Sequence, residues 1–195
     1  MTASAQWQNI DNGRLLYREE FLSQQQADEL YHSLYTKTHW RQESITLFGR
    51  SVLQPRLQAW FSEHAYQYSG LLLKPTPIPP SIATLKKQCE HICRQEFNSV
   101  LLNLYRNGQD YMGWHQDNEK ELGHNPIIAS ISLGAERKFT LKHKDSKQKL
   151  DYKLSHGSLF VMAGEVQHYW KHALPKTTLI TEPRINLTFR YIECR

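Results

Sequence analysis

The feature that most constrains the fold is a series of short β-strand patterns that fills the second half of the chain. From Asn98 onward, short apolar or alternating segments follow one another, and turn residues or polar breaks separate most of them. The segments are SVLLNLY, PIIASISLG, KFTLKHK, KLDYKL, GSLFVMAG, VQHYWKH and RINLTFRYIE. So many short strands in one region predict a β-sandwich or a jelly roll. The open end of a jelly roll can gather side chains from strands that lie far apart in the sequence.

Two helix patterns precede these strands. In residues 23–37, Ser23 and Gln26 form a capping-box pattern, and apolar residues follow at helical spacing. A proline-dense connector, residues 74–81, leads into a second helix, for which Ser81 is the expected N-cap. The apolar stripe of this helix is Ile82, Leu85, Cys89, Ile92, Cys93 and Phe97. Helices followed by many strands predict an α+β protein.

The composition fits one folded domain. Of the 195 residues, 39% are hydrophobic and 11% aromatic, enough for a substantial core. No apolar stretch approaches the roughly 20 residues that span a bilayer, and the N-terminus lacks a signal-peptide pattern. Three cysteines form no disulfide framework, which indicates a reducing compartment; Cys89 and Cys93 fit a buried helix face better than a zinc site. We expect a monomer with no membrane partner, cytoplasmic (nucleoid-associated in a bacterium) or nuclear in a eukaryote.

The basic residues concentrate in one segment. The formal net charge is +5 and the pI about 9.1, and residues 137–153 hold seven basic residues against two aspartates. The basic residues are Arg137, Lys138, Lys142, Lys144, Lys147, Lys149 and Lys153. One interpretation is a solvated hairpin whose lysines protect a sheet edge from aggregation. The other is a surface for a polyanionic partner, and charge alone does not separate the two.

The last strand pattern, RINLTFR at residues 184–190, is the most informative. Alternate residues of a strand point to opposite faces, so Ile185, Leu187 and Phe189 are expected on one face. The residues expected on the other face are Arg184, Asn186, Thr188 and Arg190. A buried face with two arginines needs anionic partners, because an unpaired buried charge is very costly. Those partners are either internal carboxylates or a bound dicarboxylate.

His115 and Asp117, in the stretch WHQDN, are candidate metal ligands separated by one residue. Taken with either His168 or His172 in HYWKHALP, they give two histidines and one carboxylate. This set is the facial triad of non-haem Fe(II) oxygenases, which leaves positions open for a cosubstrate and dioxygen. Zinc can use the same residues with water as its fourth ligand. The paired-arginine strand favours iron with 2-oxoglutarate, because a guanidinium can hold the far carboxylate by two hydrogen bonds.

The stretches NLYRNGQDYMGWHQDNE, IASISLGAERKFTLKHKD, HGSLFVMAG, HALP and PRINLTFR resemble the AlkB family of Fe(II)/2-oxoglutarate-dependent dioxygenases. The resemblance is closest to the DNA-repair members that act on duplex DNA, and it runs over roughly residues 45–192. It implies a double-stranded β-helix (jelly-roll) core with N-terminal helices and a nucleotide-recognition lid. The implied segments are an N-terminal segment with a helix (1–43), the lid (44–73), a connector and helix (74–97) and the catalytic core (98–195).

The resemblance also assigns residues around the cofactor. It implies that His115, Asp117 and His172 hold Fe(II), because the family's second histidine lies just before a small-Leu-Pro segment, here Ala173-Leu174-Pro175. His168 is then a packing or supporting residue. Arg184 is expected to grip the distal carboxylate of 2-oxoglutarate. The other positions that the resemblance places around this cosubstrate are Asn103, Tyr105, Asn186, Thr188 and Arg190.

Five further residues fall at substrate positions of the family, and one of them, Asn118, stands where duplex-acting relatives often have a second aspartate. Tyr66 and Tyr68 fall at aromatic positions of the lid, and Tyr68 is expected to stack on a flipped base opposite His115. Phe48 matches a position that probes the base stack. Aromatic stacking is worth about 1–3 kcal/mol per base, although these rings can also serve simply as core packing. The remaining two positions, next to the metal-ligand motif, are Asn118 and Glu119.

The implied reaction is oxidative demethylation of N-alkylated DNA bases of the N1-methyladenine and N3-methylcytosine type. Fe(II), 2-oxoglutarate and O2 would be consumed with release of formaldehyde and succinate, and a base in a duplex would have to be flipped out. The partner would be alkylated DNA, double- or single-stranded, with the lysine-rich segment contacting phosphates. The alternatives are the same chemistry on RNA or on a protein, a nucleic-acid-binding relative without catalysis, and a zinc hydrolase.

Overall fold

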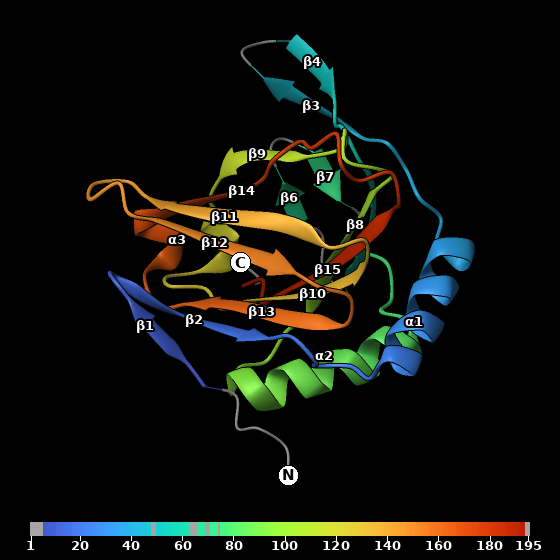
Figure 1. The fold of residues 1–195 in the computed structure, drawn as a ribbon, viewed down its shortest axis with the longest axis horizontal. Coiled ribbons are helices and arrows are strands. Elements are labelled where there is room, and N and C mark those ends of the chain that lie inside the picture. The colour runs from blue at the N-terminus through green and yellow to red at the C-terminus, as the bar shows by residue number, and fades with distance from the viewer. Residues whose placement is uncertain (1–5, 48–49, 63–65, 69–70, 74, 194–195) are drawn as a thin grey trace.

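The computed structural model contains two antiparallel β-sheets packed face to face, with two helices on the outer side of the larger sheet (Figure 1). The structure describes residues 6–47, 50–62, 66–68, 71–73 and 75–193. The larger sheet runs in the order β1 (Gln8–Ile10), β2 (Gly13–Arg18), β13 (Ser158–Ala163), β10 (Ile128–Gly134), β15 (Arg184–Arg190), β8 (Ser99–Tyr105) and β5 (Leu57–Ser62). The smaller sheet runs in the order β12 (Lys149–Leu154), β11 (Arg137–His143), β14 (Trp170–Leu174) and β9 (Met112–His115). The α+β fold with a jelly-roll core is confirmed.

The two faces of the larger sheet carry different side chains. On β15, Ile185, Leu187 and Phe189 are fully buried in the core between the sheet and the helices. The alternate residues of the same strand line a pocket between the two sheets, and they are Arg184, Asn186, Thr188 and Arg190. The alternation read from the sequence therefore holds: one face of this strand builds the hydrophobic core and the other builds a polar site.

Helix α1 (Gln24–Lys37) begins as the sequence predicts. Ser23 is the N-cap, its hydroxyl accepts from the Gln26 main-chain N–H at 3.3 Å, and the Gln26 side chain accepts from the Ser23 main-chain N–H at 3.0 Å. The reciprocal pair satisfies two main-chain donors that an uncapped helix would leave open. Ala27 and Leu34 bury the inner face of the helix against the larger sheet.

Helix α2 (Pro80–Cys93) differs from the prediction at both ends. Its N-cap is Pro79 and not Ser81, and Pro80 occupies the first helical position, where a missing N–H costs nothing. The helix ends at Cys93 because Arg94 takes a left-handed conformation with φ of 51°, so Phe97 packs against the same core from outside the helix.

Two of the three cysteines lie within the described residues. Cys89 and Cys93 are buried free thiols in the core between α2 and the larger sheet, as the helix-stripe interpretation predicts. Cys194 lies outside the described residues. Within the described part of the chain, no helix has the length and apolar character needed to cross a membrane.

The smaller sheet contains the lysine-rich hairpin. Strands β11 and β12 pair in antiparallel register, with Lys142 opposite Lys149, and Lys142 also lies opposite Lys171 on β14. Arg137 corrects the prediction, because it is 2% exposed and does not contribute to this surface. It donates instead to main-chain carbonyls, including that of Pro175 at 2.8 Å, and so braces the loops at one end of the sheet.

The segment VQHYWKH, predicted as one strand, is half helix. Residues Val166–Tyr169 form a single helical turn, α3, and β14 begins only at Trp170. Trp170 is fully buried and its indole N–H donates to the carbonyl of Asp11 at 2.7 Å. This long-range contact fixes where the strand starts, which local alternation cannot indicate.

The range 44–73, expected to form the lid, contains two hairpins. Strands β3 (Ser44–Leu47) and β4 (Arg50–Leu53) form one hairpin, which projects from the top of the molecule in Figure 1. Strands β6 (Tyr66–Tyr68) and β7 (Leu71–Leu73) form the other. The same range also contains β5, which is an edge strand of the larger sheet paired with β8. Strand β5 therefore lies between the two hairpins in the chain and connects both of them to the larger sheet.

Candidate metal centre and cosubstrate pocket

A pocket of about 600 Å³, measured with its open mouth, lies between the two sheets. On the larger-sheet side, the lining residues of β15 are polar, whereas β13 contributes the apolar Phe160. The smaller sheet contributes the apolar Phe139 and Leu174. The polar and charged lining residues are Asn103, Tyr105, His115, Asp117, Ser130, His172, Arg184, Asn186, Thr188 and Arg190. Pairing of β15 with β8 sets Arg184 opposite Tyr105 and Asn186 opposite Asn103, so these positions form adjacent rows across the sheet.

His115, Asp117 and His172 meet at one point of this pocket. Strand pairing places His115 on β9 directly opposite His172 on β14, and the imidazole centroids are 4.2 Å apart. One potential ligand atom from each of the three residues lies within 4.8 Å of the others. His168 is not part of this cluster and instead packs against His124, with ring centroids 5.1 Å apart. Residue spacing left His168 and His172 as alternatives, and His172, the one that the resemblance assigns, is the histidine beside Asp117.

A hydrogen bond of His115 determines which of its ring nitrogens is available to bind a metal. Its Nδ1 lies 2.9 Å from the carbonyl oxygen of Gly113, and because a carbonyl only accepts, Nδ1 carries the proton. The lone pair then remains on Nε2, which lies 4.0 Å from Asp117 Oδ1. Burial lowers the pKa of His115 in spite of the neighbouring Asp117 carboxylate, and burial together with His115 lowers the pKa of His172 to about 3. Both imidazoles are therefore neutral at physiological pH, as metal binding requires.

Asp117 is buried and ionised. Burial by itself would raise the pKa of its carboxyl group, but Arg190 and the two imidazoles lower it to about 2. Oδ2 accepts a hydrogen bond from Arg190 Nη2 at 3.1 Å. Oδ1 has no hydrogen-bond partner among the described residues. One buried carboxylate oxygen and two neutral imidazoles around a common point fit a divalent cation, and two histidines with one carboxylate are the ligand set of non-haem Fe(II).

Arg184 lies at the other end of the pocket. It is 2% exposed, its guanidinium lies 5.4 Å from the centroid of the Tyr105 ring, and Nη2 donates to Ser132 Oγ at 2.8 Å. Burial lowers its pKa to about 10, so it stays protonated at neutral pH. Among the described residues, no carboxylate forms an ion pair with it. A buried cation without an internal anion fits the carboxylate of a bound dicarboxylic acid, the second of the two alternatives that the sequence left open.

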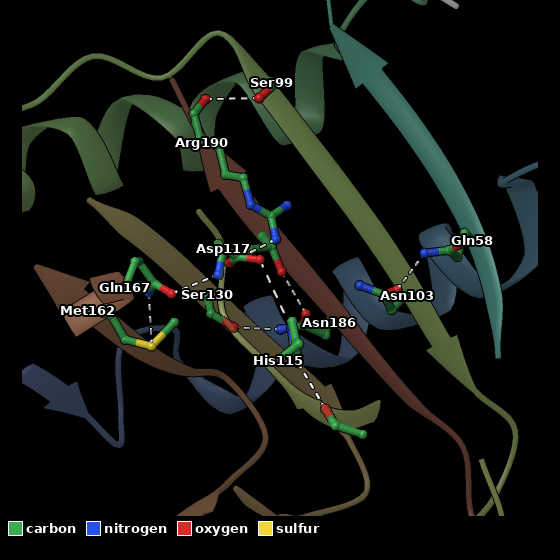
Figure 2. A network of polar contacts seen from close by, with 12 residues as sticks. Gln58, Ser99, Asn103, His115, Asp117, Ser130, Met162, Gln167, Asn186 and Arg190 are labelled. Carbon is green, nitrogen blue, oxygen red and sulfur yellow. Dashed lines mark hydrogen bonds and ion pairs between the residues drawn. The ribbon is translucent and has the colours of Figure 1, made fainter. Parts of the chain in front are cut away.

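Asn186 and Thr188 make their hydrogen bonds within the protein. The Asn186 amide donates to Ser130 Oγ at 2.6 Å, and its carbonyl oxygen accepts from the Thr188 hydroxyl at 2.8 Å (Figure 2). Ser130 and Ser132 were not selected from the sequence, although their alternation in IASISLG is a usable signal because it puts both hydroxyls on one face of the strand. Ser130 lines the pocket, and Ser132 accepts a hydrogen bond from Arg184. The cosubstrate contacts assigned to Asn186 and Thr188 stay predictions.

Asn103 is held by residues that sequence reasoning missed. Its side-chain oxygen accepts from Arg56 Nε at 2.8 Å and from Gln58 Nε2 at 3.1 Å. Arg56 is 2% exposed and also helps to lower the pKa of His115. No motif in the sequence marks Arg56, which comes to the site only because β5 pairs with β8.

The structure describes only some of the residues that were predicted to contact the substrate. Asn118 is exposed and Glu119 is half-buried at the start of a 3-10 helix (Lys120–Leu122), and neither lines the described pocket. The main chain of Tyr66 and Tyr68 is in β6, and their side chains lie outside what the structure describes. Phe48 also lies outside the described residues. The substrate contacts assigned to these five positions stay predictions.

Comparison with known proteins agrees with this geometry. The chain matches the 2OG-Fe(II) oxygenase superfamily over residues 14–190 and belongs to it. Within the superfamily its relatives are AlkB homologues. It is 38% identical over 182 residues to the human alpha-ketoglutarate-dependent dioxygenase alkB homolog 3, covering 88% of this chain and 64% of the relative. It is 36% identical over 180 residues to the human DNA oxidative demethylase ALKBH2, covering 86% of this chain and 69% of the relative.

A solved structure shares the fold. The structure of OsALKBH1 superposes with a TM-score of 0.67, covering 95% of this chain and all of that chain, at 16% sequence identity. The two-sheet architecture is therefore that of a known AlkB homologue. The present chain spans 64% of the length of the cattle and human alkB homolog 3 proteins that it matches.

Proposed function

We propose that this protein removes N-linked methyl groups from alkylated DNA bases, using Fe(II), 2-oxoglutarate and O2 and releasing formaldehyde and succinate. The observation that carries the proposal is one pocket that holds both a His-Asp-His cluster and, apart from it, the buried cation Arg184. That combination suits a metal and a dicarboxylate cosubstrate bound together. The relatives named as a dioxygenase and a DNA oxidative demethylase support the choice of substrate.

The chain's own residues would divide the work. His115, Asp117 and His172 would hold Fe(II), which when bound supplies the activation of dioxygen coupled to decarboxylation of 2-oxoglutarate. Arg184 would bind the distal carboxylate of 2-oxoglutarate and so fix its orientation. Arg190 holds Asp117 Oδ2 and leaves Oδ1 for the metal. The apolar lining residues, among them Phe139, Phe160 and Leu174, would limit the access of water to the reacting groups.

The substrate would reach this pocket as a flipped base. Hydroxylation of an N-methyl group gives a hydroxymethyl group, which breaks down to formaldehyde and the unmodified base. The pocket lies between two packed sheets, so a base stacked in a duplex has to leave the helix at a cost of a few kcal/mol, which is smallest for a damaged base. The lid hairpins β3–β4 and β6–β7 are the elements that we assign to this step.

The outer face of the smaller sheet supports a polynucleotide partner. Lys142, Lys149 and Lys171 are exposed and lie opposite one another on three neighbouring strands. Trp114, on the adjacent strand β9, is 49% exposed. Rows of lysines that contact phosphates, with an aromatic ring available for stacking, are typical of nucleic-acid surfaces. Asp151 neutralises part of this face, with one oxygen 2.8 Å from Lys138 Nζ.

A demethylation assay tests the proposal. Oligonucleotides that carry N1-methyladenine or N3-methylcytosine, as single-stranded DNA, duplex DNA and RNA, are incubated with Fe(II), 2-oxoglutarate and air, and formaldehyde is measured. We expect turnover on DNA, and none with His115→Ala. Turnover on RNA alone would change the substrate class but keep the chemistry.

A second measurement tests the binding of Fe(II) and 2-oxoglutarate independently of the substrate. Anaerobic addition of Fe(II) and 2-oxoglutarate should produce a metal-to-ligand charge-transfer band in the visible spectrum. The band without demethylation of any oligonucleotide would point to another substrate, such as a protein. Absence of the band would favour a zinc enzyme or a binding protein that has lost catalysis.

A further inference from the structure

The main chain of Asp117 lies outside the strand ladder that positions the two histidines. Strand β9 ends at His115, and its pairing with β14 shifts register between His172 and Leu174. Asp117 is nevertheless 2% exposed, so its main-chain N–H needs a hydrogen-bond partner inside the protein. The segment that carries the carboxylate therefore requires an anchor other than the sheet.

Gln167 provides that anchor. Its side-chain oxygen accepts a hydrogen bond from the Asp117 main-chain N–H at 2.9 Å, as Figure 2 shows. The neighbouring Gln116 side chain donates in turn to the main-chain oxygen of Gln167 at 3.0 Å. Gln167 is itself 1% exposed. Two hydrogen bonds thus tie residues 116–117 to helical turn α3.

The orientation of the Gln167 amide is determined by its surroundings. A main-chain N–H can only donate, so the amide oxygen has to face Asp117. The amide nitrogen then faces Met162 Sδ at 3.5 Å (Figure 2), and a thioether is a weak acceptor that tolerates the N–H. Because both ends of the amide have a matching partner, the side chain has one favourable orientation in this site.

Gln167 also connects the two ligand segments. It lies in α3, which leads directly into β14 and its ligand His172. The bond from Asp117 therefore links the loop after β9 to the same short stretch that sets His172. Arg190, on the larger sheet, holds one carboxylate oxygen of Asp117, while Gln167, in α3, holds its main chain.

We propose that Gln167 is a positioning residue of the metal centre: it fixes the main chain of Asp117 so that Oδ1 faces the imidazoles of His115 and His172. Gln167 is not among the residues that line the pocket, so it acts on the metal centre through Asp117. Removal of a group that orients a metal ligand by a hydrogen bond typically lowers metal affinity by 10- to 100-fold. The proposal concerns the metal centre alone and is independent of the choice of nucleic-acid substrate.

Metal affinity of the variants tests the proposal without any assay of activity. Gln167→Met keeps the length of the side chain and removes the strong acceptor. Calorimetric titration of the metal-free protein with Co(II), which does not oxidise during the measurement, should show affinity at least 10-fold weaker than that of the wild type. Gln25→Met, the same change on the exposed face of α1, should leave the affinity unchanged.

Thermal unfolding of the metal-free proteins separates positioning from a general structural role. A lower Tm for Gln167→Met with Co(II) affinity within two-fold of the wild type would overturn the proposal. If Gln167→Met does not fold, Gln116→Leu removes the second bond of the same anchor from a half-exposed position. It should weaken Co(II) binding several-fold, and unchanged affinity in that variant would equally overturn the proposal.

Discussion

Asp117 illustrates how a buried carboxylate depends on a compensating positive charge. Its carboxylate is buried beside the guanidinium of Arg190, and the side chains of the pair are 2% and 6% exposed. Removal of one partner from a buried ion pair usually costs far more than the pair contributes, because the remaining charge loses its compensation. The metal ion would add a second compensating charge at Oδ1.

Arg190→Met should therefore destabilise the metal-free protein by about 3 kcal/mol. The free energy of unfolding is measured by urea denaturation, with and without Mn(II), and the metal should restore part of the loss because it also neutralises Asp117. The matched control is Lys138→Met, which removes a cation from an exposed pair with Asp151. Exposed pairs contribute about 0–1 kcal/mol, so equal losses in the two variants would contradict the buried-pair interpretation.

Not every residue of the site was visible in the sequence. The motif spacing indicated His115 and Asp117, and strand alternation indicated Arg184 and Arg190. Gln167 had no such signal, because its importance comes from one hydrogen bond to a residue 50 positions away. Motifs report ligands, whereas the groups that orient ligands are chosen by the tertiary structure.

At the scale of elements, α1 is the helix whose first residue the sequence predicts most clearly, because Ser23 and Gln26 form a capping box. Ser23→Ala removes the hydroxyl that accepts from the Gln26 main-chain N–H. We expect a loss of about 1 kcal/mol in the free energy of unfolding, measured by chemical denaturation. Ser33→Ala, the same change inside the helix, should be neutral or slightly stabilising. A loss of similar size in both variants would show that the cap is not the cause.

The thiols of α2 give a pH-dependent prediction. Burial raises the pKa of Cys89 and raises that of Cys93 to about 12. Below the ordinary thiol pKa both the folded and the unfolded chain hold the proton, so the full stability is present there. Above it, the unfolded chain loses the proton first, and stability should decline as the pH rises from about 9 toward 12. The expected loss is about 1 kcal/mol per thiol at pH 10.

Urea unfolding at pH 8, 9 and 10 measures this effect. Lysines and tyrosines also titrate in this range, so the comparison is with Cys93→Ala, which lacks one of the two thiols. The variant should lose less stability between pH 8 and pH 10 than the wild type. Parallel pH profiles would mean that the thiol at 93 ionises normally in the folded protein.

Elements were predicted well where local pattern and tertiary contacts agree. The pattern SVLLNLY coincides with β8 at both ends. The pattern RINLTFRYIE starts where β15 starts but runs three residues past the end of that strand at Arg190. The strands β1, β2 and β5 went unrecognised. β2 pairs with the distant strand β13 and β5 with the distant strand β8, whereas β1 is a three-residue edge strand that pairs only with β2. The start of β14 was wrong because it depends on the contact of Trp170 with Asp11.

At the scale of the whole molecule, the helices cover one side of the larger sheet (Figure 1). The lysine row, formed by Lys142, Lys149 and Lys171, lies on the smaller sheet. If DNA phosphates bind along the lysine row, Lys142→Ala with Lys171→Ala should lower the salt dependence of DNA binding. The slope of log K against log salt should fall by roughly 0.7–0.9 for each contact removed.

Fluorescence anisotropy with labelled oligonucleotides at several salt concentrations measures this slope. The matched control is Lys37→Ala with Lys87→Ala, two exposed lysines on α1 and α2. The control should leave the slope unchanged. Equal slopes for both double variants would exclude the lysine row as the phosphate-binding surface.

The sequence by itself determined which side-chain types form the site and which residues share a strand face. Side-chain type and a period of two are local properties, so His115, Asp117 and the arginine face of β15 could be read from short stretches. Tertiary structure alone decided which arginine pairs with Asp117 and which glutamine holds its main chain, and it placed His172, the histidine that the resemblance assigns, beside Asp117. Those choices depend on strand register and on contacts between residues far apart in the chain, and no local pattern encodes the distance between two atoms that only folding brings together.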